Sequence, residues 1–184
     1  MKNTLVRRLT FLSSAFAGVL LMTSVARAQC DLFPIALSAQ TLVNVAPGTE
    51  INDILNGTQP GNFGWLTWAG SPSVPTLVDS LTGNGDSYTY VDPTGANNNE
   101  IVVGSWIQGK PGVSNSSNVR GALNTLETEV ISVPVWDVSI AQGNNSLYHV
   151  VGFASVQITG YHLPKQNAIS VLFLGFVSCG ATTN

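Results

Sequence analysis

Residues 147–161 of the chain read LYHVVGFASVQITGY, and this stretch does most to decide the expected fold. Its apolar and polar side chains fall on opposite sides of an extended chain: Val150, Ala154, Val156 and Ile158 on one, and Ser155, Gln157 and Thr159 on the other. Alternation with a period of two is typical of a strand that is buried on one face only. We therefore expect a half-buried strand from Leu147 to Tyr161.

The neighbouring segments also predict strands. Residues 169–177 are apolar at nearly every position, which indicates a central strand covered on both faces. Residues 130–138 contain Pro134, which removes a ladder donor and so predicts an edge strand or a bulge at that point. Four further runs rich in β-branched and aromatic residues are expected to be strands: Thr41–Ala46, Phe63–Ala69, Ser87–Val91 and Ile101–Ile107.

Two short segments show helical spacing instead. In Ser73–Leu81 a proline stands in the first turn and apolar residues recur at intervals of three and four, and Ser117–Leu126 repeats that spacing. The chain shows no internal repeat and no long linker, and its length is in the single-domain range. We expect a mainly β fold of the α+β class, with two short helices laid on an antiparallel sheet, a sandwich or an open barrel in a single domain.

The first 28 residues have the pattern of a secretory signal peptide. Basic residues within the first eight positions precede an apolar stretch over residues 9–25, and Ala26-Arg27-Ala28 supplies a small-x-small cleavage site. The competing interpretation is an uncleaved anchor, but hydroxyl side chains interrupt the stretch, and a spanning helix needs about 20 largely apolar residues. We expect residues 1–28 to be a signal peptide and residues 29–184 to form one β-rich extracytoplasmic domain without a stable membrane span.

Cleavage would leave a strongly acidic domain. Its basic residues would be Lys110, Arg120 and Lys165, against ten acidic residues, which gives a net charge of −7. Proteins bind the phosphates of nucleic acids through clustered Lys and Arg side chains. We therefore expect neither a nucleic acid nor an anionic lipid as a partner.

The two cysteines stand at opposite ends of the expected mature chain. Cys30 follows the cleavage site closely, and Cys179 lies five residues before the last residue, Asn184. In an oxidising compartment the pair is expected to form a disulfide that joins the two ends of the domain. The alternative is a redox or nucleophilic thiol, but neither cysteine has a CxxC partner or a neighbouring histidine in sequence.

The sequence contains no recognised catalytic motif. Nucleophilic catalysis needs a serine or cysteine beside a base, and the two histidines, His149 and His162, stand in no known catalytic spacing. The serine motif GxSxG and the zinc motif HExxH are both absent. We expect a protein that is not an enzyme, with no catalytic residues, no cofactor and no bound metal, and with both histidines at solvent-facing or edge positions.

Acidic residues offer two weaker possibilities. Asp79, Asp86 and Asp92 flank a Gly/Asn loop that could wrap calcium, but their spacing does not match an EF-hand and Gly-Asn-Gly-Asp is an ordinary turn signal. Glu127 and Glu129 could pair as acid and base, although two carboxylates at a helix-to-strand junction are more typical of solvated surface charges. Turn chemistry and surface charge are the expected roles.

Four tryptophans are many for so small a domain. Trp65 and Trp68 are three residues apart, so on a strand they face opposite sides and both are buried only if the strand is covered twice. We therefore expect one of them to be exposed, where it could bind a ligand by stacking on a sugar or lie in an interface. Core packing, the commonest role of large aromatic side chains, is the alternative.

Five segments follow one another in a recognisable order across residues 60–177: Pro60–Leu66, Gly104–Gly112, Val119–Leu126, Val130–Asp137 and Tyr148–Tyr161. This order resembles that of the TadG-like proteins associated with Tad (Flp) pili, which show a GNFG segment, a Pro-Gly turn before a short helix, a strand with a proline and an aspartate, and a strand containing GFA. The resemblance implies a surface or periplasmic protein with no catalytic residues to carry over. Family members typically have a longer chain and an uncleaved membrane segment, so a free secreted or periplasmic form is expected here.

Two hypotheses of function follow. The first is a non-catalytic extracytoplasmic structural or interaction domain whose partners are other cell-surface or pilus proteins. The second is a carbohydrate-binding, lectin-like secreted domain that holds a glycan on Trp65 or Trp68. The first expects a protein partner and the second a glycan, and both place the protein in the periplasm, at the cell surface or outside the cell.

Overall fold

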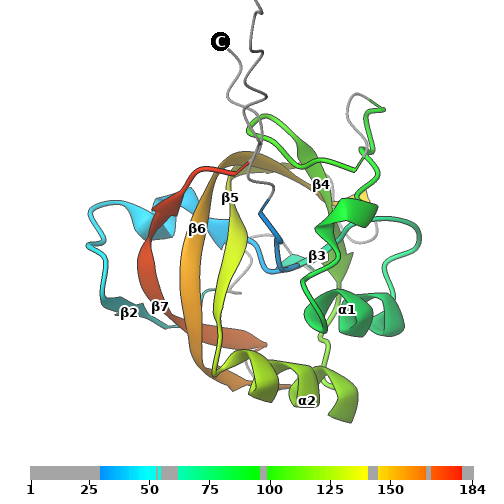
Figure 1. Ribbon diagram of the computed structural model, residues 1–184. Coiled ribbons are helices and arrows are strands. Elements are labelled where there is room, and N and C mark those ends of the chain that lie inside the picture. Colours follow the sequence, from blue (N-terminus) through cyan, green and yellow to red (C-terminus); the bar gives the residue numbers. More distant parts are fainter. Residues whose placement is uncertain are drawn as a thin grey trace, which may run out of the picture.

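The computed structural model describes residues 30–52, 54, 62–95, 99–140, 145–164 and 167–179. The expected signal peptide lies outside these ranges. The described part of the chain is mainly β with two α-helices, as predicted (Figure 1). Its elements in chain order are β1 (Leu37–Ser38), the 3-10 helix η1 (Ala39–Leu42), β2 (Thr49–Ile51), β3 (Asn62–Thr67), α1 (Val74–Leu81), the 3-10 helix η2 (Ser87–Thr89), β4 (Trp106–Pro111), α2 (Ser117–Leu126), β5 (Val130–Ile140), β6 (Leu147–His162) and β7 (Ala168–Val177).

The sixteen-residue strand β6 organises the sheet. Along one edge it pairs with β5, and its other edge is divided between β4, opposite residues 147–149, and β7, opposite residues 153–162. The strand order is β1-β5-β6-β4-β3, with β7 and then β2 attached to β6, and the sheet does not close. All pairs are antiparallel except β1 with β5, so the expected antiparallel sheet is in fact mixed.

Residues 30–38, here named the N-terminal segment, connect the two edges of the sheet. On one side Leu32 bridges Ser132 of β5, and β1 pairs with β5 a little further on. On the other side Ile35 bridges Trp65 of β3. Because this segment is extended between two strands, its successive side chains enter two different hydrophobic cores.

The first core lies under the two α-helices, and the second lies on the other side of the N-terminal segment. Ile35 and Leu37 enter the first core, which contains the inner faces of β5, β6 and β7 and the apolar faces of α1 and α2. Leu32 and Ala36 enter the second core, together with side chains of β4 and the first half of β6. The predicted alternation in β6 is confirmed from Ala154 to Ile158, because Ala154, Val156 and Ile158 are buried in the first core. Val150, predicted on the same face, lies in the second core instead, because the register between β5 and β6 shifts between Val150 and Gly152.

The two predicted helices are confirmed almost to the residue. Ser73 caps α1 and Ser116 caps α2, because each serine hydroxyl accepts a hydrogen bond from the backbone N–H three residues later, at 3.2 Å. Such caps satisfy backbone donors that have no partner inside the helix. The helices pack on each other and on the first core (Figure 1).

Two predicted strands are wrong. The segment predicted from Thr41 to Ala46 contains the end of η1 and a turn in which Asn44 has a φ of 61°, and Ser87–Val91 contains η2, entered through Asp86 with a φ of 53°. A left-handed residue turns the chain away from an extended path, whatever the β-propensity of its neighbours. A third strand, predicted over Ile101–Ile107, is displaced and begins only at Trp106.

The predictions for β5 and β7 hold in part. Pro134 itself pairs in register with Phe153, and the register between β5 and β6 shifts only after Val135, so the irregularity predicted at Pro134 lies one residue further along β5. In β7 the residues from Ala168 to Val171 are all buried, as expected for a strand covered on both faces, but Phe176 is largely exposed. β7 has a strand on both sides only in its middle, where the three-residue strand β2 lies opposite residues 171–173.

Candidate functional site

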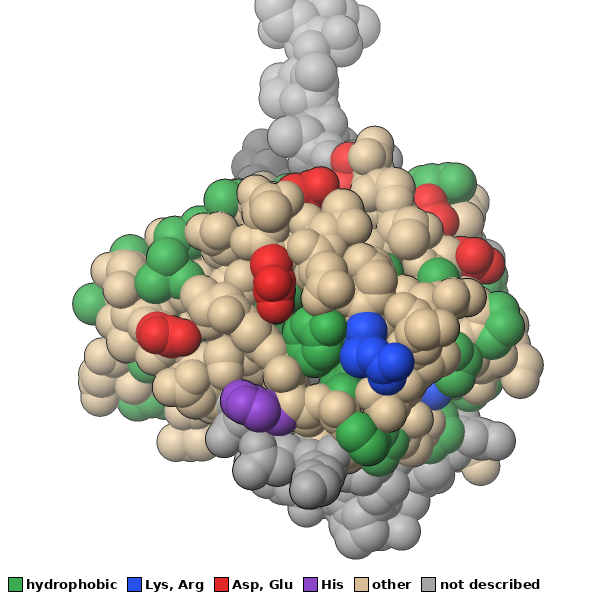
Figure 2. All heavy atoms as spheres, turned by 90° about the horizontal axis from the view of Figure 1, so that it is seen from below, with side chains coloured by type: hydrophobic (Ala, Val, Ile, Leu, Met, Phe, Trp, Pro, Cys, Tyr) green, Lys and Arg blue, Asp and Glu red, His purple; other side chains and the backbone are tan. Residues whose placement is uncertain are grey.

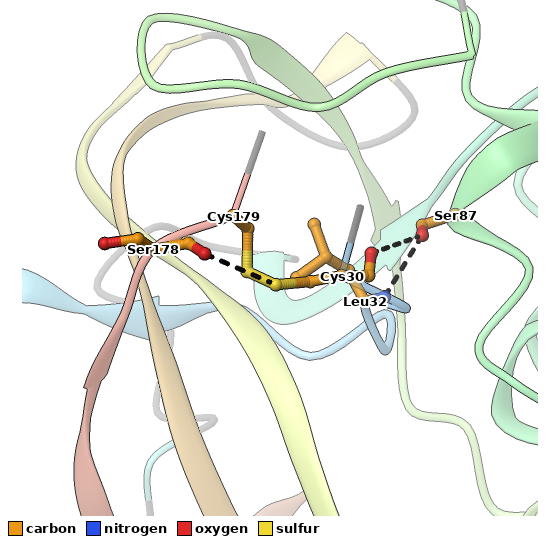
Figure 3. Close-up of a disulfide and its surroundings, with 5 residues drawn as sticks. All are labelled: Cys30, Leu32, Ser87, Ser178 and Cys179. Carbon is orange, nitrogen blue, oxygen red and sulfur yellow. Dashed lines mark hydrogen bonds between the residues drawn. A yellow bond between two sulfur atoms is a disulfide. The ribbon is translucent and has the colours of Figure 1, made fainter. Parts of the chain in front are cut away.

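The predicted disulfide is confirmed, and it fixes the start of the described chain beside the end of β7. Cys30 and Cys179 are bonded, with their Cα atoms 5.3 Å apart (Figure 3). The Ser87 hydroxyl lies on the other side of the N-terminal segment, where it accepts a hydrogen bond from the Leu32 N–H at 3.0 Å and donates one to the Cys30 carbonyl at 3.5 Å. The segment is thus held between β7 and η2.

The prediction that Trp65 or Trp68 is exposed is wrong. Their exposed fractions are 0% and 1%, and each indole N–H is satisfied internally, from Trp65 to the Asn167 side-chain oxygen at 3.3 Å and from Trp68 to the Gly85 carbonyl at 2.6 Å. The two rings do lie in different cores, as their spacing required. Both are buried because β3 is covered on both faces, so neither ring presents a surface on which a sugar could stack.

A third tryptophan, Trp106, lies partly exposed beside a histidine and a carboxylate. The rings of Trp106 and His149 are 5.0 Å apart between centroids, and the His149 Nδ1 lies 2.8 Å from the Asp137 Oδ1. The hydrogen bond with His149 is the main cause that lowers the pKa of the Asp137 carboxyl. Sequence reasoning did not find this group because β5 is irregular between Trp136 and Ser139, so the pairing could not be counted from the hairpin.

Lys110 is the other residue whose position the sequence did not predict. Its side chain is buried, its Nζ donates to the Pro111 carbonyl at 3.3 Å, and burial lowers its pKa. Since lysine is rarely buried, nothing in the local sequence indicates such an environment for Lys110.

Elsewhere in the described interior, three buried side-chain polar atoms have no hydrogen-bond partner: Ser114 Oγ, Ser146 Oγ and Asn167 Nδ2.

The described surface also contains a hollow of about 310 Å³, here named the β5 hollow. It lies between the N-terminal segment, which bridges β5 at Ser132, the turn after α1 and the start of β5. A second hollow, of about 230 Å³, lies between the ends of α1 and α2 and shares Gly83 and Glu129 with the first. The residues that line the β5 hollow are Cys30, Asp31, Phe33, Gly83, Asn84, Glu129, Val130, Ile131 and Ser132.

Among the residues that the structure describes, one strand edge is open in the β5 hollow. The Ser132 carbonyl accepts a hydrogen bond from the Phe33 N–H at 2.9 Å, so Ser132 directs its backbone groups away from β6. In an antiparallel pair, residues two apart direct these groups to the same side. Val130, opposite Gln157, therefore directs its N–H and carbonyl away from β6 and into the hollow. Among the described residues, no backbone group of the N-terminal segment or of the turn after α1 bonds to them. Val130 is also 63% exposed.

At Asp92 the structure shows the turn chemistry that was expected of the acidic residues. Asp92 accepts hydrogen bonds from the backbone N–H and the hydroxyl of Thr94, at 2.7 and 2.6 Å, which is turn chemistry. In the described part of the chain no three His, Cys, Asp or Glu side chains gather into a metal site. Glu129 lines the β5 hollow, whereas Glu127 does not.

Comparisons with protein-family models, with curated proteins and with solved structures find no match for this chain. The resemblance to TadG-like proteins thus rests on the order of the sequence segments. Within the described ranges, no helix combines the length and the apolar character needed to cross a membrane.

Proposed function

We propose that this chain is a non-catalytic extracytoplasmic interaction domain that binds another protein through the β5 hollow. The observation that carries the proposal is the open edge at Val130, which lies in a hollow next to the Cys30–Cys179 disulfide. A strand edge with free backbone groups is a binding surface for another chain. Cell-surface machinery of the kind that the TadG-like resemblance implies would use such a domain.

The disulfide supports both the extracytoplasmic location and the use of the β5 hollow as a binding site. Disulfides form and persist in oxidising compartments, so the bond is compatible with a periplasmic, cell-surface or secreted location. The bond also holds one wall of the hollow, since Cys30 lines it and is tied to the end of β7. A preformed wall lowers the ordering cost of binding, because less chain must be immobilised when a partner arrives.

Photo-crosslinking in the cells that make this protein would test the proposal. A photoreactive amino acid at Asn84, an exposed residue of the β5 hollow, should give a discrete adduct with one partner protein. The same amino acid at Glu50, an exposed residue of β2, serves as the control and should give none. Adducts at neither position, or the same adducts at both, would contradict a partner in the hollow. Identification of the partner would then test the link to a pilus.

A second candidate function is glycan binding, and Trp106 rather than Trp65 or Trp68 favours it. An aromatic ring beside the polar atoms of His149 and Asp137 can stack on a sugar and hydrogen-bond its hydroxyls. On a glycan array Trp106→Ala should weaken binding roughly three- to tenfold. Tyr88→Ala, which removes an exposed aromatic ring of η2, should leave it unchanged. Absence of binding on a broad array would remove this candidate.

A further inference from the structure

The β5 hollow and the neighbouring helix ends are electronegative. Asp31 and Glu129 both line the β5 hollow, and no lysine or arginine is among its lining residues. The last turns of α1 and α2 border the second hollow, and neither turn contains a basic residue. Because a helix carries partial negative charge at its C-terminal end, the two helices add to the potential of the two carboxylates.

The rest of the described surface does little to neutralise this charge. Of the ten acidic residues in the chain, only Asp53 lies outside the described ranges. The two described basic residues are Lys110, which is buried, and Arg120, whose guanidinium bonds to Asn115 at 2.7 and 2.8 Å. Figure 2 shows one face on which acidic side chains are dispersed and basic ones gather in one place. Such a surface attracts cationic partners over a distance of about 10 Å.

The size of the hollow and its backbone groups indicate which kind of cationic ligand it can bind. A volume of about 310 Å³ equals the liquid share of about ten water molecules, which leaves room for a long side chain. A metal ion or a small amine cannot both accept from the Val130 N–H and donate to the Val130 carbonyl. An extended peptide backbone can do both, as one strand does for its neighbour.

We propose that the β5 hollow binds an extended, basic peptide segment of a partner protein. The segment would pair its backbone with Val130 and place a lysine or arginine side chain between Asp31 and Glu129. This inference rests on the proposed function and adds the chemistry of the partner. Charge complementarity selects the segment and speeds its arrival, and the backbone pairing fixes its direction.

Binding of labelled octalysine to the oxidised protein, measured by fluorescence anisotropy, tests the inference. The L-peptide should bind, and raising the salt concentration should weaken the complex. Glu129→Gln should weaken it roughly two- to fivefold, as expected for the loss of one exposed ion pair. Glu50→Gln makes the same change of charge on β2, which does not line the hollow, and should leave the affinity unchanged.

A backbone variant separates peptide docking from simple attraction of charge. Val130→Pro removes the N–H that points into the hollow, and because this N–H does not bond to β6, the strand ladder should stay intact. The proline variant should lose binding of octa-L-lysine, whereas Val130→Ala should keep it. Circular dichroism and the melting temperature show whether each variant is folded. Octa-D-lysine carries the same charge but mismatches the strand, so it should bind more weakly.

Three results would overturn the inference: no binding of octa-L-lysine, equal weakening by Glu129→Gln and Glu50→Gln, or equal binding of the L- and D-peptides. The proposed function, binding of a partner protein, is tested separately by the crosslinking experiment. If Asn84 crosslinks to a partner that has no basic segment, the interaction domain stands and the basic peptide falls. If neither octalysine nor any cellular protein is captured, both proposals fall.

Discussion

The two halves of the described chain are built in different ways. Residues 130–177 form three long strands that follow one another and pair as neighbours, β5 with β6 and β6 with β7. Residues 30–111 contain short strands, two 3-10 helices and the extended N-terminal segment, and they pair mostly with parts of the chain that are far away in sequence. Ile35 and Ile169 nevertheless lie in the same core, each without exposed surface. Irregular backbone does not therefore mean loose packing.

The largest expected effect comes from removing matched core side chains in the two halves. Ile35→Ala in the N-terminal segment and Ile169→Ala in β7 should each lower the free energy of unfolding by about 2–5 kcal/mol, because both leave a cavity in the first core. Denaturant titration measures both. A loss below about 1 kcal/mol for Ile35→Ala alone would show that the irregular half is not part of the cooperative fold.

Removal of the disulfide should have the next largest effect. The double change Cys30→Ala with Cys179→Ala should cost about 2–5 kcal/mol of stability and leave the β signature in circular dichroism. Hydrogen exchange should rise more at the Phe33 N–H, which bonds to Ser132, than at Val156 within β6. Uniform loss of protection across both halves would contradict a local effect. Intact mass of the purified protein should show a deficit of two hydrogens without reductant.

A pair of glycines in the turn after α1 gives a smaller effect. Gly85 has a φ of 80°, and a Cβ on it would collide with the backbone of Leu32 in the N-terminal segment. Gly85→Ala should therefore cost about 1–3 kcal/mol, from backbone strain and the collision together. Gly83 has a φ of 65° and open space around it, so Gly83→Ala should cost only about 1 kcal/mol. Equal losses in thermal unfolding would mean that the turn moves freely away from Leu32.

The smallest effect concerns the partly exposed pair of Asp137 and His149. Since the histidine lowers the pKa of Asp137 in the folded protein, this carboxyl stabilises the fold above its unfolded pKa of about 3.9, and the contribution is lost as the pH falls through the folded value. Solvent screens the pair, so Asp137→Asn should cost about 0.2–1 kcal/mol at pH 6 and almost nothing at pH 2. Asp79→Asn makes the same change of charge on the exposed side of α1 and is the control for the substitution itself.

The sequence predicts the regular half and the two α-helices well because their signals are local. β6 and β7 are recognisable from the spacing and density of their apolar side chains. The helices are recognisable from their helical spacing and, in α1, from the proline in the first turn. The strands β1 and β2, of two and three residues, are too short for any pattern. They are strands only because β5 and β7 lie beside them. These pairings join residues about a hundred positions apart in sequence, so a short stretch of sequence does not reveal them.

The candidate site depends on the same long-range contacts. The disulfide could be predicted, since the two cysteines of the sequence stand at the two ends of the expected mature domain and each has no other cysteine to pair with. The β5 hollow could not, because it depends on where the N-terminal segment leaves β5 and on which way Val130 directs its backbone groups. The wrong prediction for Trp65 and Trp68 has the same origin, since nothing in β3 itself shows that another segment covers its second face.

The Cys30–Cys179 bond has a mechanical consequence. The two cysteines are separated by 149 residues in sequence, and the bond joins them directly. Tension applied to the two ends of this domain would pass through two sulfur atoms and would not load the sheet between them. While the bond is intact, a pull on these ends would therefore leave the strands folded.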